Sequence, residues 1–352
     1  MKIVFYIDQL LNGGAERVTA ILASEFSNKP NCTIYVVALN EGILYQLNEK
    51  VQYVLIKQTQ LRKPWKTFFR LYHSIIEIRK INPDVIYSLG YMGQYVLMAR
   101  LLKMIDTRII VSERTNPYIV PSKKINVFVR NYLYGKSDVI VSQTPQAEEY
   151  YKKRVRTRTC VIPNPIIPNL PLWRGQNSKD IVCACRLAEQ KNIPMLIRAF
   201  KQVHKIYPEF KLRIYGQGKL KEDLQSLIEY QGLSDSITLE GQTSHLHDIL
   251  ANSYMSVLSS DYEGISNTMI ESLGIGIPTL CTDCPMGGAA MFIKDGVNGL
   301  LSTVGDVDEF AKKMIYLIEH RDKLEEMSEN ARKITKILEQ GVIAQRWYEL
   351  AL

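Results

Sequence analysis

The sequence predicts an α/β protein with two doubly wound, parallel-sheet domains. Short apolar runs rich in β-branched residues alternate with helical patterns along the chain, which is typical of parallel strands covered on both faces. The alternation breaks once, at a proline-rich segment, and then begins again. The length of 352 residues also suits two domains of roughly 150 residues each.

The first predicted domain spans residues 1–165. Its apolar runs are separated by helical patterns such as residues 18–26. Strands are expected at Lys2–Ile7, Thr33–Leu39, Tyr53–Ile56, Asp84–Ser88, Arg108–Ser112 and Asp138–Ser142.

A break follows, because residues 162–171 contain four prolines, which cannot continue a helix or a central strand. Residues 163–178 are therefore predicted to be a hinge or linker.

The second predicted domain spans residues 178–340. A helix is expected over about 193–207, where apolar residues recur with helical spacing. Strands are expected at Ile181–Cys185, Lys211–Tyr215, Ile237–Leu239, Met255–Leu258, Pro278–Cys281 and Leu300–Ser302. The last helical segment, residues 341–352, packs either on this domain or back on the first, and the sequence leaves both open.

Charge is unevenly divided between the two halves. Residues 1–165 carry 24 Lys or Arg and 12 Asp or Glu, whereas the remainder carries 20 and 24. A basic half favours an anionic partner such as lipid, a polyphosphate acceptor or nucleic acid. The chain has no helix-turn-helix, zinc-finger or RNA-binding signature, so we expect no nucleic-acid partner. A basic nucleic-acid-binding protein is the alternative from a different functional class.

No targeting or membrane-spanning segment is predicted. The chain contains no run of about 18 apolar residues, and the apolar run before Asp8 is too short for a signal peptide. We therefore expect a cytoplasmic protein.

Charged residues follow two predicted strands of the second domain. Arg186 and Lys191 are five residues apart and can both reach one diphosphate, Arg by bidentate contacts and Lys as a point charge. Glu263 and Glu271 follow the other strand and can accept hydrogen bonds from sugar or ribose hydroxyls. Because ligands bind at the carboxyl ends of parallel strands, we expect one site.

Glycines and a helix start add to this site. Ser266 or Asn267 is predicted to cap a helix, whose first N–H groups near Asn267 and Thr268 favour an anion. Paired Gly13 and Gly14, after the first strand, would let a ligand approach the backbone. The turn at Gly216 and Gly218 is a weaker nucleotide-side signal.

Together these motifs resemble those of glycosyltransferase family 4, whose members are retaining enzymes of the GT-B fold. The resemblance covers nearly the whole chain and is strongest in the second half. It rests on Gly13-Gly14-Ala15-Glu16-Arg17, Arg186-Leu187 with Lys191, Gly216 and Gly218, Gly241, and Glu263 and Glu271 followed by Gly276-Ile277-Pro278.

The resemblance implies two Rossmann-like domains facing a central cleft, with the acceptor on the N-terminal side and the nucleotide sugar on the C-terminal domain. It implies that Arg186 and Lys191 hold the diphosphate, Glu271 the ribose and Glu263 the transferred sugar or the reaction centre. Gly14 would approach the donor from the first domain.

No metal or further cofactor is expected, because members of the family are typically metal-independent. Asp306 and Asp308 spell the D-x-D of metal-dependent sugar transferases, but they open a predicted helix at about 308–317, so capping explains them. The cysteine pairs 183/185 and 281/284 have spacings compatible with zinc or redox chemistry. Both pairs lie in apolar runs, however, where cysteine packs as a small hydrophobe.

This chain departs from the family at two points. Asn192 stands where Gly is common, and Asn tolerates turn geometry. Many members carry a His after the strand matching Arg108–Ser112, where this chain has Glu113 and Arg114. We expect Glu113 or Arg114 to replace that sugar-contacting histidine.

The segment Ser112–Asn116 and the loop Gly13–Arg17 are similar to those of bacterial transferases that build O-antigen, capsule or lipid-linked oligosaccharides. The resemblance therefore implies transfer of a hexose or N-acetylhexosamine, with GalNAc or Gal favoured, from a UDP-sugar. The acceptor would be a glycan or a polyprenyl-diphosphate-linked oligosaccharide. A GT-B-like sugar-nucleotide epimerase is the alternative enzyme.

Cations and large aromatic residues are mixed in two segments, residues 61–73 and 122–134. Such segments suit an interfacial helix on an anionic leaflet. The alternative is an ordinary amphipathic helix with its aromatic residues in the core. We expect peripheral association with the inner face of the plasma membrane.

Overall fold

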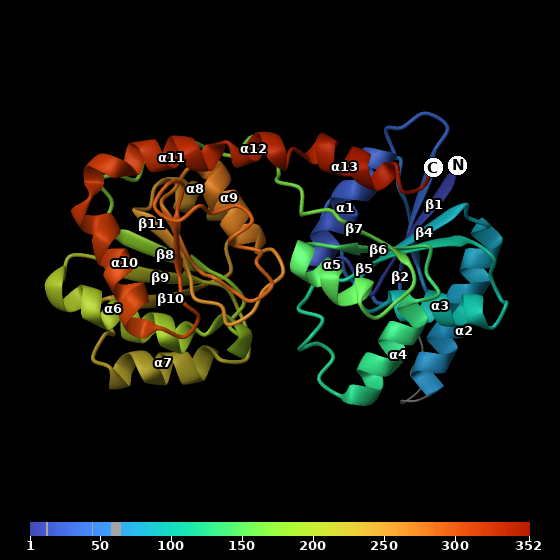
Figure 1. Cartoon of the computed structure of the whole chain (residues 1–352), viewed down its shortest axis with the longest axis horizontal. Helices are drawn as coiled ribbons and strands as arrows, with labels where there is room; N and C mark the ends of the chain where they lie inside the picture. The colour runs from blue at the N-terminus through green and yellow to red at the C-terminus, as the bar shows by residue number, and fades with distance from the viewer. Residues whose placement is uncertain (12, 44, 58–64) are drawn as a thin grey trace. The chain divides into compact units, whose positions relative to one another are not determined.

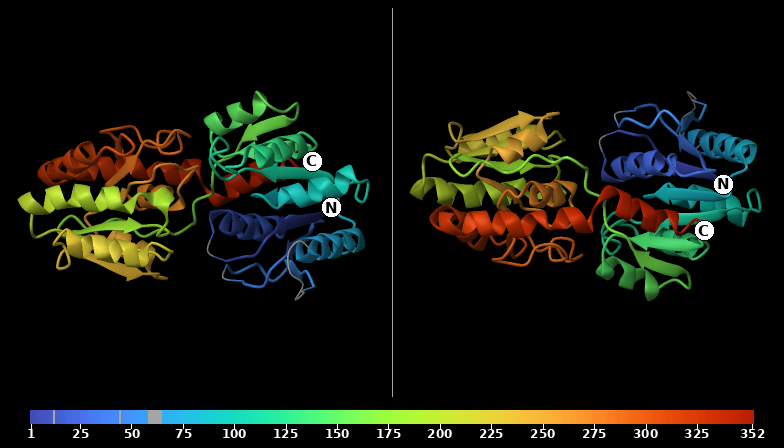
Figure 2. Two further views of the ribbon diagram at one scale, coloured as in Figure 1. Left: turned by 90° about the horizontal axis from the view of Figure 1, so that it is seen from below. Right: turned by 90° about the horizontal axis from the view of Figure 1, so that it is seen from above.

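The computed structural model describes residues 1–11, 13–43, 45–57 and 65–352 (Figure 1). The chain forms two compact units: unit 1 consists of Met1–Pro165 with Gln340–Leu352, and unit 2 of Ile166–Glu339. Each unit holds one parallel sheet, and helices lie on both faces of each sheet (Figure 2). The predicted α/β class with two doubly wound sheets is confirmed.

The sheet of unit 1 has seven strands in the order β3-β2-β1-β4-β5-β6-β7. Its strands are β1 (Lys2–Ile7), β2 (Thr33–Ala38), β3 (Gln52–Leu55), β4 (Val85–Leu89), β5 (Arg108–Ser112), β6 (Val139–Ser142) and β7 (Arg158–Val161). The first six agree with the predicted runs to within one residue. The edge strand β7 was not predicted, because its four residues are only partly buried and begin with Arg158, so they lack an apolar run.

Helices cover both faces of this sheet because side chains alternate along each strand. Val4 and Tyr6 of β1 join a core cluster with residues of α2, α3 and α4. Phe5, between them, points to the other face, where its ring lies 5.6 Å from Phe26 of α1. The helices of unit 1 are α1 (Gly14–Phe26), α2 (Trp65–Ile81), α3 (Gly93–Leu101), α4 (Lys124–Tyr134), α5 (Pro145–Lys152) and α13 (Gln340–Tyr348).

The last helix, α13, packs in unit 1. Trp347 is fully buried, its ring lies 5.9 Å from that of Tyr87, and the Tyr87 hydroxyl donates to the Trp347 carbonyl at 2.7 Å. The Gln340 amide donates to Glu25 of α1 at 2.6 Å. The end of the chain, whose partner the sequence left open, therefore contributes to the core beneath β1 and β4.

The sheet of unit 2 has six strands in the order β10-β9-β8-β11-β12-β13. Its strands are β8 (Asp180–Ala184), β9 (Lys211–Tyr215), β10 (Ile237–Gly241), β11 (Met255–Leu258), β12 (Thr279–Thr282) and β13 (Leu300–Ser302). Its helices are α6 (Ile193–Ile206), α7 (Lys221–Tyr230), α8 (Leu246–Ala251), α9 (Asn267–Ile275), α10 (Val307–Glu319), α11 (Leu324–Arg332) and α12 (Ile334–Ile337). All six strands agree with the predicted runs to within two residues.

Two cores lie on opposite faces of this sheet. Ile181 and Cys183 of β8 belong to a large cluster with residues of α6, α7, α10 and α11. Val182 and Ala184 belong to a second cluster with Ile275 and with residues of α8. The helices α8 and α9 therefore share one face of the sheet.

Most of the segment predicted as a linker is held by unit 2. The chain passes between the units after Pro165. The backbone N–H of Trp173 donates to the Ile275 carbonyl at 2.9 Å, and the indole N–H of Trp173 donates to the Ser253 carbonyl at 2.8 Å. A Cβ at Gly175 would lie 1.9 Å from the Ser253 carbonyl oxygen, so the backbone approaches as closely as only glycine permits.

The strand order reverses between β1 and β4 in unit 1 and between β8 and β11 in unit 2. In open α/β sheets, ligands bind beyond the carboxyl ends of the strands at such switch points. None of the described helices combines the length and the apolar character needed to span a bilayer.

Candidate functional site

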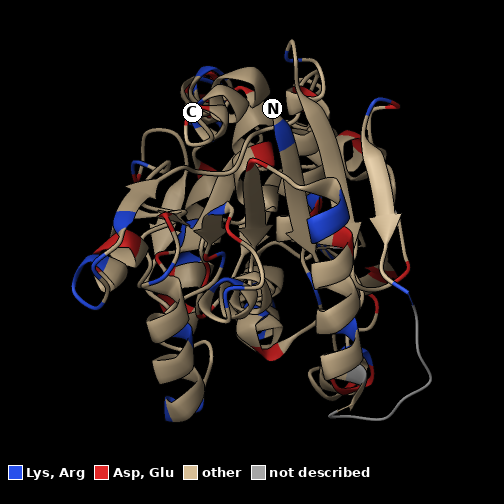
Figure 3. Ribbon diagram, turned by 90° about the vertical axis from the view of Figure 1, so that its right-hand side faces the viewer, with Lys and Arg blue, Asp and Glu red and all other residues tan. Residues whose placement is uncertain are grey.

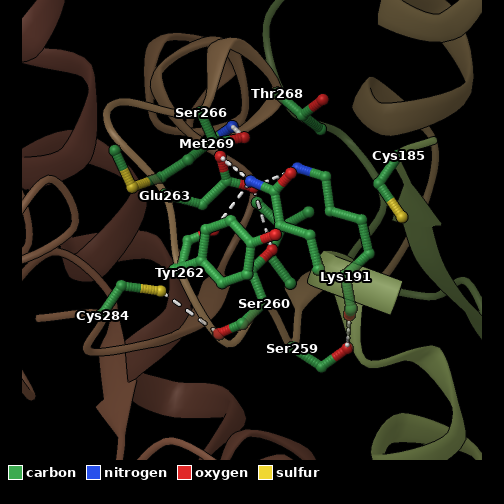
Figure 4. Close-up of polar contacts among 12 residues, drawn as sticks. Cys185, Lys191, Ser259, Ser260, Tyr262, Glu263, Ser266, Thr268, Met269 and Cys284 are labelled. Carbon is green, nitrogen blue, oxygen red and sulfur yellow. Dashed lines mark hydrogen bonds and ion pairs between the residues drawn. The ribbon is translucent and has the colours of Figure 1, made fainter. Parts of the chain in front are cut away.

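The charged residues predicted from the sequence lie at the switch point of unit 2. Arg186 and Lys191 follow β8, Glu263 follows β11, and Glu271 lies in α9. Because β8 and β11 are neighbours, the loops that follow them meet (Figure 4).

Lys191 and Glu263 form an ion pair in which Lys191 Nζ donates to Glu263 Oε1. Their side chains are only 13% and 18% exposed. The Ser260 hydroxyl also donates to Oε1, at 3.0 Å, and the Gln190 amide to Oε2 at 3.3 Å. Burial by itself lowers the pKa of Lys191, but Glu263 with the thiols of Cys185 and Cys183 raises it, and the pKa lies above that of an ordinary lysine.

Further hydrogen bonds fix the two loops to each other. The Asp261 N–H donates to the Gln190 carbonyl, and the Ser259 hydroxyl to the Lys191 carbonyl, both at 2.9 Å. The Asn192 amide donates to Asp261 at 2.7 Å. Asn192 adopts the left-handed conformation (φ 41°, ψ 45°) and caps α6, which is the turn geometry that Asn was expected to tolerate.

Arg186 differs from Lys191, since it is exposed and makes no side-chain hydrogen bond or ion pair with the residues that the structure describes. Its loop is held in place by the turn after β9. A Cβ at Gly216 (φ +139°) would lie 1.8 Å from the Cys185 carbonyl oxygen, and one at Gly218 would lie 2.1 Å from that of Leu187. Both glycines therefore allow close contact with the backbone on either side of Arg186.

Gly241 ends β10 with φ +77°, and its carbonyl accepts the Gly216 N–H at 2.7 Å. Gly216 and Gly241 thus belong to the backbone that supports the site, and their contact with a donor stays a prediction.

The start of α9 adjoins the ion pair (Figure 4). Of the two predicted caps, Ser266 and Asn267, Ser266 is the N-cap and accepts the Met269 N–H. Asn267 is the first helical residue, and the Thr268 hydroxyl donates to the Ala184 carbonyl at 3.0 Å, which fixes the helix start to the end of β8. The first N–H groups of a helix favour an anion, so α9 adds positive potential to that of Arg186.

Glu271 lies one turn into α9 and is 3% exposed. Its Oε2 is 2.9 Å from Nε2 of His247 in α8. Sequence reasoning identified Glu271 and missed His247, because a single histidine in a six-residue helix carries no motif. Its partner is 24 residues away in the chain.

A small cavity lies beside Glu263. It is lined in part by Ser260, Ser266, Met269 and Cys284. The Cys284 thiol donates to the Ser260 carbonyl at 3.2 Å, and burial raises its pKa to about 12. This thiol therefore stays protonated and packs as an apolar group.

No group of three or more His, Cys, Asp or Glu residues in the described part of the chain is arranged to hold a metal ion. Asp306 caps α10 by accepting the Glu309 N–H at 2.9 Å, which confirms the capping interpretation of the D-x-D sequence.

In unit 1, Gly13 is the N-cap of α1 with extended backbone (φ −123°, ψ 156°), and Gly14 is the first helical residue. The Glu16 carboxylate folds over Gly13, so that a Cβ there would lie 1.7 Å from Glu16 Oε2. A Cβ at Gly13 would therefore meet only the end of a flexible side chain, and the contact of Gly13 and Gly14 with a ligand stays a prediction.

Glu113, after β5, is buried within unit 1. Its carboxylate accepts the Tyr151 hydroxyl at 3.2 Å and the Thr115 hydroxyl at 2.9 Å, and lies 3.9 Å from the buried guanidinium of Arg130. Arg114, the next residue, donates to Asn164, and burial lowers its pKa to about 10. Glu113 thus stabilises the segment after β5, and direct substrate contact by either residue stays a prediction.

Two family models match the chain. Glycosyltransferase Family 4 matches residues 12–170, and Glycosyl transferases group 1 matches residues 173–334. Together they cover most of both units.

Relatives are found among archaeal and bacterial glycosyltransferases. An uncharacterized glycosyltransferase of Methanocaldococcus jannaschii is 31% identical over 249 residues, which are 64% of this chain and 61% of that protein, so the match spans less than two thirds of its length. The N-acetylgalactosamine-N,N'-diacetylbacillosaminyl-diphospho-undecaprenol 4-alpha-N-acetylgalactosaminyltransferase of Campylobacter jejuni is 27% identical over 355 residues, covering 94% of each chain.

Among solved structures, HepE of Anabaena, in complex with UDP and glucose, is similar with a TM-score of 0.84 and 19% identity over 99% of each chain. That likeness shows the GT-B fold, as the sequence predicted. The two family models, which together cover most of the chain, show that it belongs to glycosyltransferase family 4.

Proposed function

We propose that this glycosyltransferase transfers a hexose or N-acetylhexosamine, with GalNAc or Gal favoured, from a UDP-sugar, with retention of anomeric configuration. The observation that carries the proposal is the convergence of Arg186, Lys191, Glu263 and Glu271 at one switch point of unit 2. This set pairs cations for a diphosphate with carboxylates for hydroxyl groups.

In this proposal Arg186, Lys191 and the start of α9 hold the diphosphate. The ammonium of Lys191 has three N–H donors, so its bond to Glu263 leaves others for phosphate oxygens. Glu271 accepts the ribose hydroxyls, and Glu263 contacts the transferred sugar. No metal is required, because the cations and the helix start stabilise the charge on the departing UDP.

The transfer breaks the bond between the sugar C1 and the β-phosphate oxygen, which keeps the electron pair and leaves as UDP. The acceptor hydroxyl oxygen bonds to C1 on the same face, and its proton passes to the departing phosphate oxygen. The protein contributes positioning and electrostatic stabilisation.

We further propose that the acceptor is a glycan or a polyprenyl-diphosphate-linked oligosaccharide of bacterial surface polysaccharide synthesis. The name of the Campylobacter relative, which describes transfer of GalNAc to a diphospho-undecaprenol-linked sugar, supports both the transferred sugar and the acceptor class. A lipid-linked acceptor also requires that the enzyme work at a membrane surface.

The outer surfaces of α2 and α4 support a membrane partner. Each helix presents large apolar side chains at helical spacing that are at least 49% exposed. They are Trp65, Phe68 and Tyr72 on α2, and Ile125, Phe128 and Tyr132 on α4. Ile75 and Ile78, nearer the end of α2, pack into the core. The exposed side chains of Trp65, Phe68 and Tyr72 are therefore not needed to attach the helix to unit 1.

The charges on these helices also favour an anionic membrane surface as the partner. Neither helix has an acidic residue in its first turn, and exposed Lys123 and Lys124 stand at the start of α4, where a helix dipole disfavours cations. Both helices extend beyond the carboxyl ends of the strands of unit 1 (Figure 3). Residues 61–64 of the predicted interfacial stretch lie outside the described residues.

The first prediction concerns the diphosphate. Replacing Arg186 by Ala should weaken UDP binding, measured calorimetrically without metal, about tenfold, since a hydrogen bond to a charged group contributes roughly 1.5–3 kcal/mol. Arg186 is exposed without a described partner, so the fold should not change. Exposed Arg198 on α6 provides the matched control, and equal UDP affinity of R186A and R198A would contradict the assignment.

The second prediction concerns the reaction. With UDP-GalNAc or UDP-Gal and a polyprenyl-diphosphate-linked oligosaccharide, the chain should release UDP and form an α-linked product in the presence of EDTA. Thin-layer separation of the lipid and proton NMR of the linkage measure this. A β-linked product would exclude retention, and an epimerised nucleotide sugar without UDP release would favour the epimerase.

The third prediction concerns the membrane. Replacing Phe68 and Phe128 together by Ser should reduce cosedimentation with vesicles containing phosphatidylglycerol at least severalfold, because burial of a Phe contributes about 1.5–3 kcal/mol. The control is Tyr230→Ser, which changes an exposed aromatic residue of α7 in unit 2. Unchanged binding of the double variant would show that α2 and α4 do not contact the lipid.

A further inference from the structure

The carboxylate of Glu271 is more deeply buried than the other charged groups of unit 2. The side chain is 4% exposed and lies at the middle of α9. Taking a carboxylate out of water is costly unless hydrogen bonds and charge compensate it. A contact that supplies this compensation is therefore important for the ionised form of Glu271.

His247 supplies one such contact from a different element. Its Nε2 is 2.9 Å from Glu271 Oε2. An ionised carboxylate can only accept hydrogen bonds, so His247 must be the donor, with its proton on Nε2. The imidazole itself is 30% exposed, which places it between the buried carboxylate and solvent.

The two helices that carry His247 and Glu271 both begin at the edge of the sheet where ligands bind. α8 follows β10 and α9 follows β11, so both start beyond the carboxyl ends of parallel strands. They pack on the same face of the sheet and lie side by side (Figure 1). The bond between His247, in the first turn of α8, and Glu271, one turn into α9, therefore joins the two helices near the edge where the donor is proposed to bind.

We propose that His247 is a positioning residue, which holds the Glu271 carboxylate in the orientation that meets the ribose hydroxyls of the nucleotide. This inference rests on the proposed function, in which Glu271 contacts the ribose. The two oxygens of a carboxylate can accept about four hydrogen bonds, so a bond to His247 is compatible with bonds to hydroxyl groups. Without His247, Glu271 would lose the hydrogen bond that α8 supplies to its Oε2.

The test measures calorimetric binding of UDP and of 2′,3′-dideoxy-UDP, which lacks the ribose hydroxyls, to the full chain. Wild type should prefer UDP. His247→Ala should weaken UDP binding about tenfold, the effect of roughly one charge-assisted hydrogen bond, and leave the dideoxy-UDP affinity unchanged. His247→Gln, whose amide can still donate to the carboxylate, should recover most of the loss.

His245→Ala is the matched control, because His245 is exposed and lies two residues earlier. Equal losses of UDP and dideoxy-UDP affinity in H247A, or an unchanged UDP affinity, would overturn the inference and leave the proposed function standing. A wild-type chain that binds no UDP would overturn the proposed function and this inference with it. If H247A does not fold, the same comparison is made with H247Q against His247→Leu.

Discussion

The ion pair between Lys191 and Glu263 is the interaction on which the candidate donor site depends. It joins the loop after β8 to the loop after β11, across the switch point of the unit 2 sheet. Either charge alone would be costly at this depth, because desolvation of an unpaired ion is not repaid. The pair keeps the ammonium charged near the start of α9, while exposed Arg186 provides a second cation for a ligand. The surrounding hydrogen bonds of Asp261, Ser259 and Asn192 fix the geometry of both loops.

In unit 1, a buried ion pair also stabilises a loop. The guanidinium of Arg130 is almost fully buried, donates to the Pro117 carbonyl at 3.0 Å and to the Tyr150 hydroxyl at 2.7 Å, and lies 3.9 Å from Glu113. Its guanidinium carbon also lies 5.1 Å from the Tyr150 ring centroid. Glu113 and Arg130 thereby hold the chain that follows β5. In both units, a buried charge pair stabilises a loop at the carboxyl edge of the sheet, where a parallel α/β fold binds its ligands.

Local signals account for what could be predicted from the sequence. Apolar runs identified the core strands, and the positions of Arg186, Lys191, Glu263 and Glu271 after two strands predicted a shared site. Contacts between distant segments could not be predicted in this way. Lys191 and Glu263 are 72 residues apart, and the bond between His247 and Glu271 exists only because α8 and α9 pack together. The pairing of Glu113 with Arg130 could not be predicted either, since nothing in the segment after β5 indicates it, and substrate contact by Glu113 or Arg114 stays a prediction. The edge strand β7 lacks the apolar run that identified its neighbours.

The central claim is that the carboxyl edge of the unit 2 sheet binds a nucleoside diphosphate through Arg186 and Lys191. The most direct measurement is a crystal structure of the chain with UDP, grown without divalent metal. The account predicts diphosphate oxygens within hydrogen-bond distance of both cations and ribose hydroxyls on Glu271. A nucleotide bound at the carboxyl edge of the unit 1 sheet, or one whose diphosphate contacts neither cation, would contradict it.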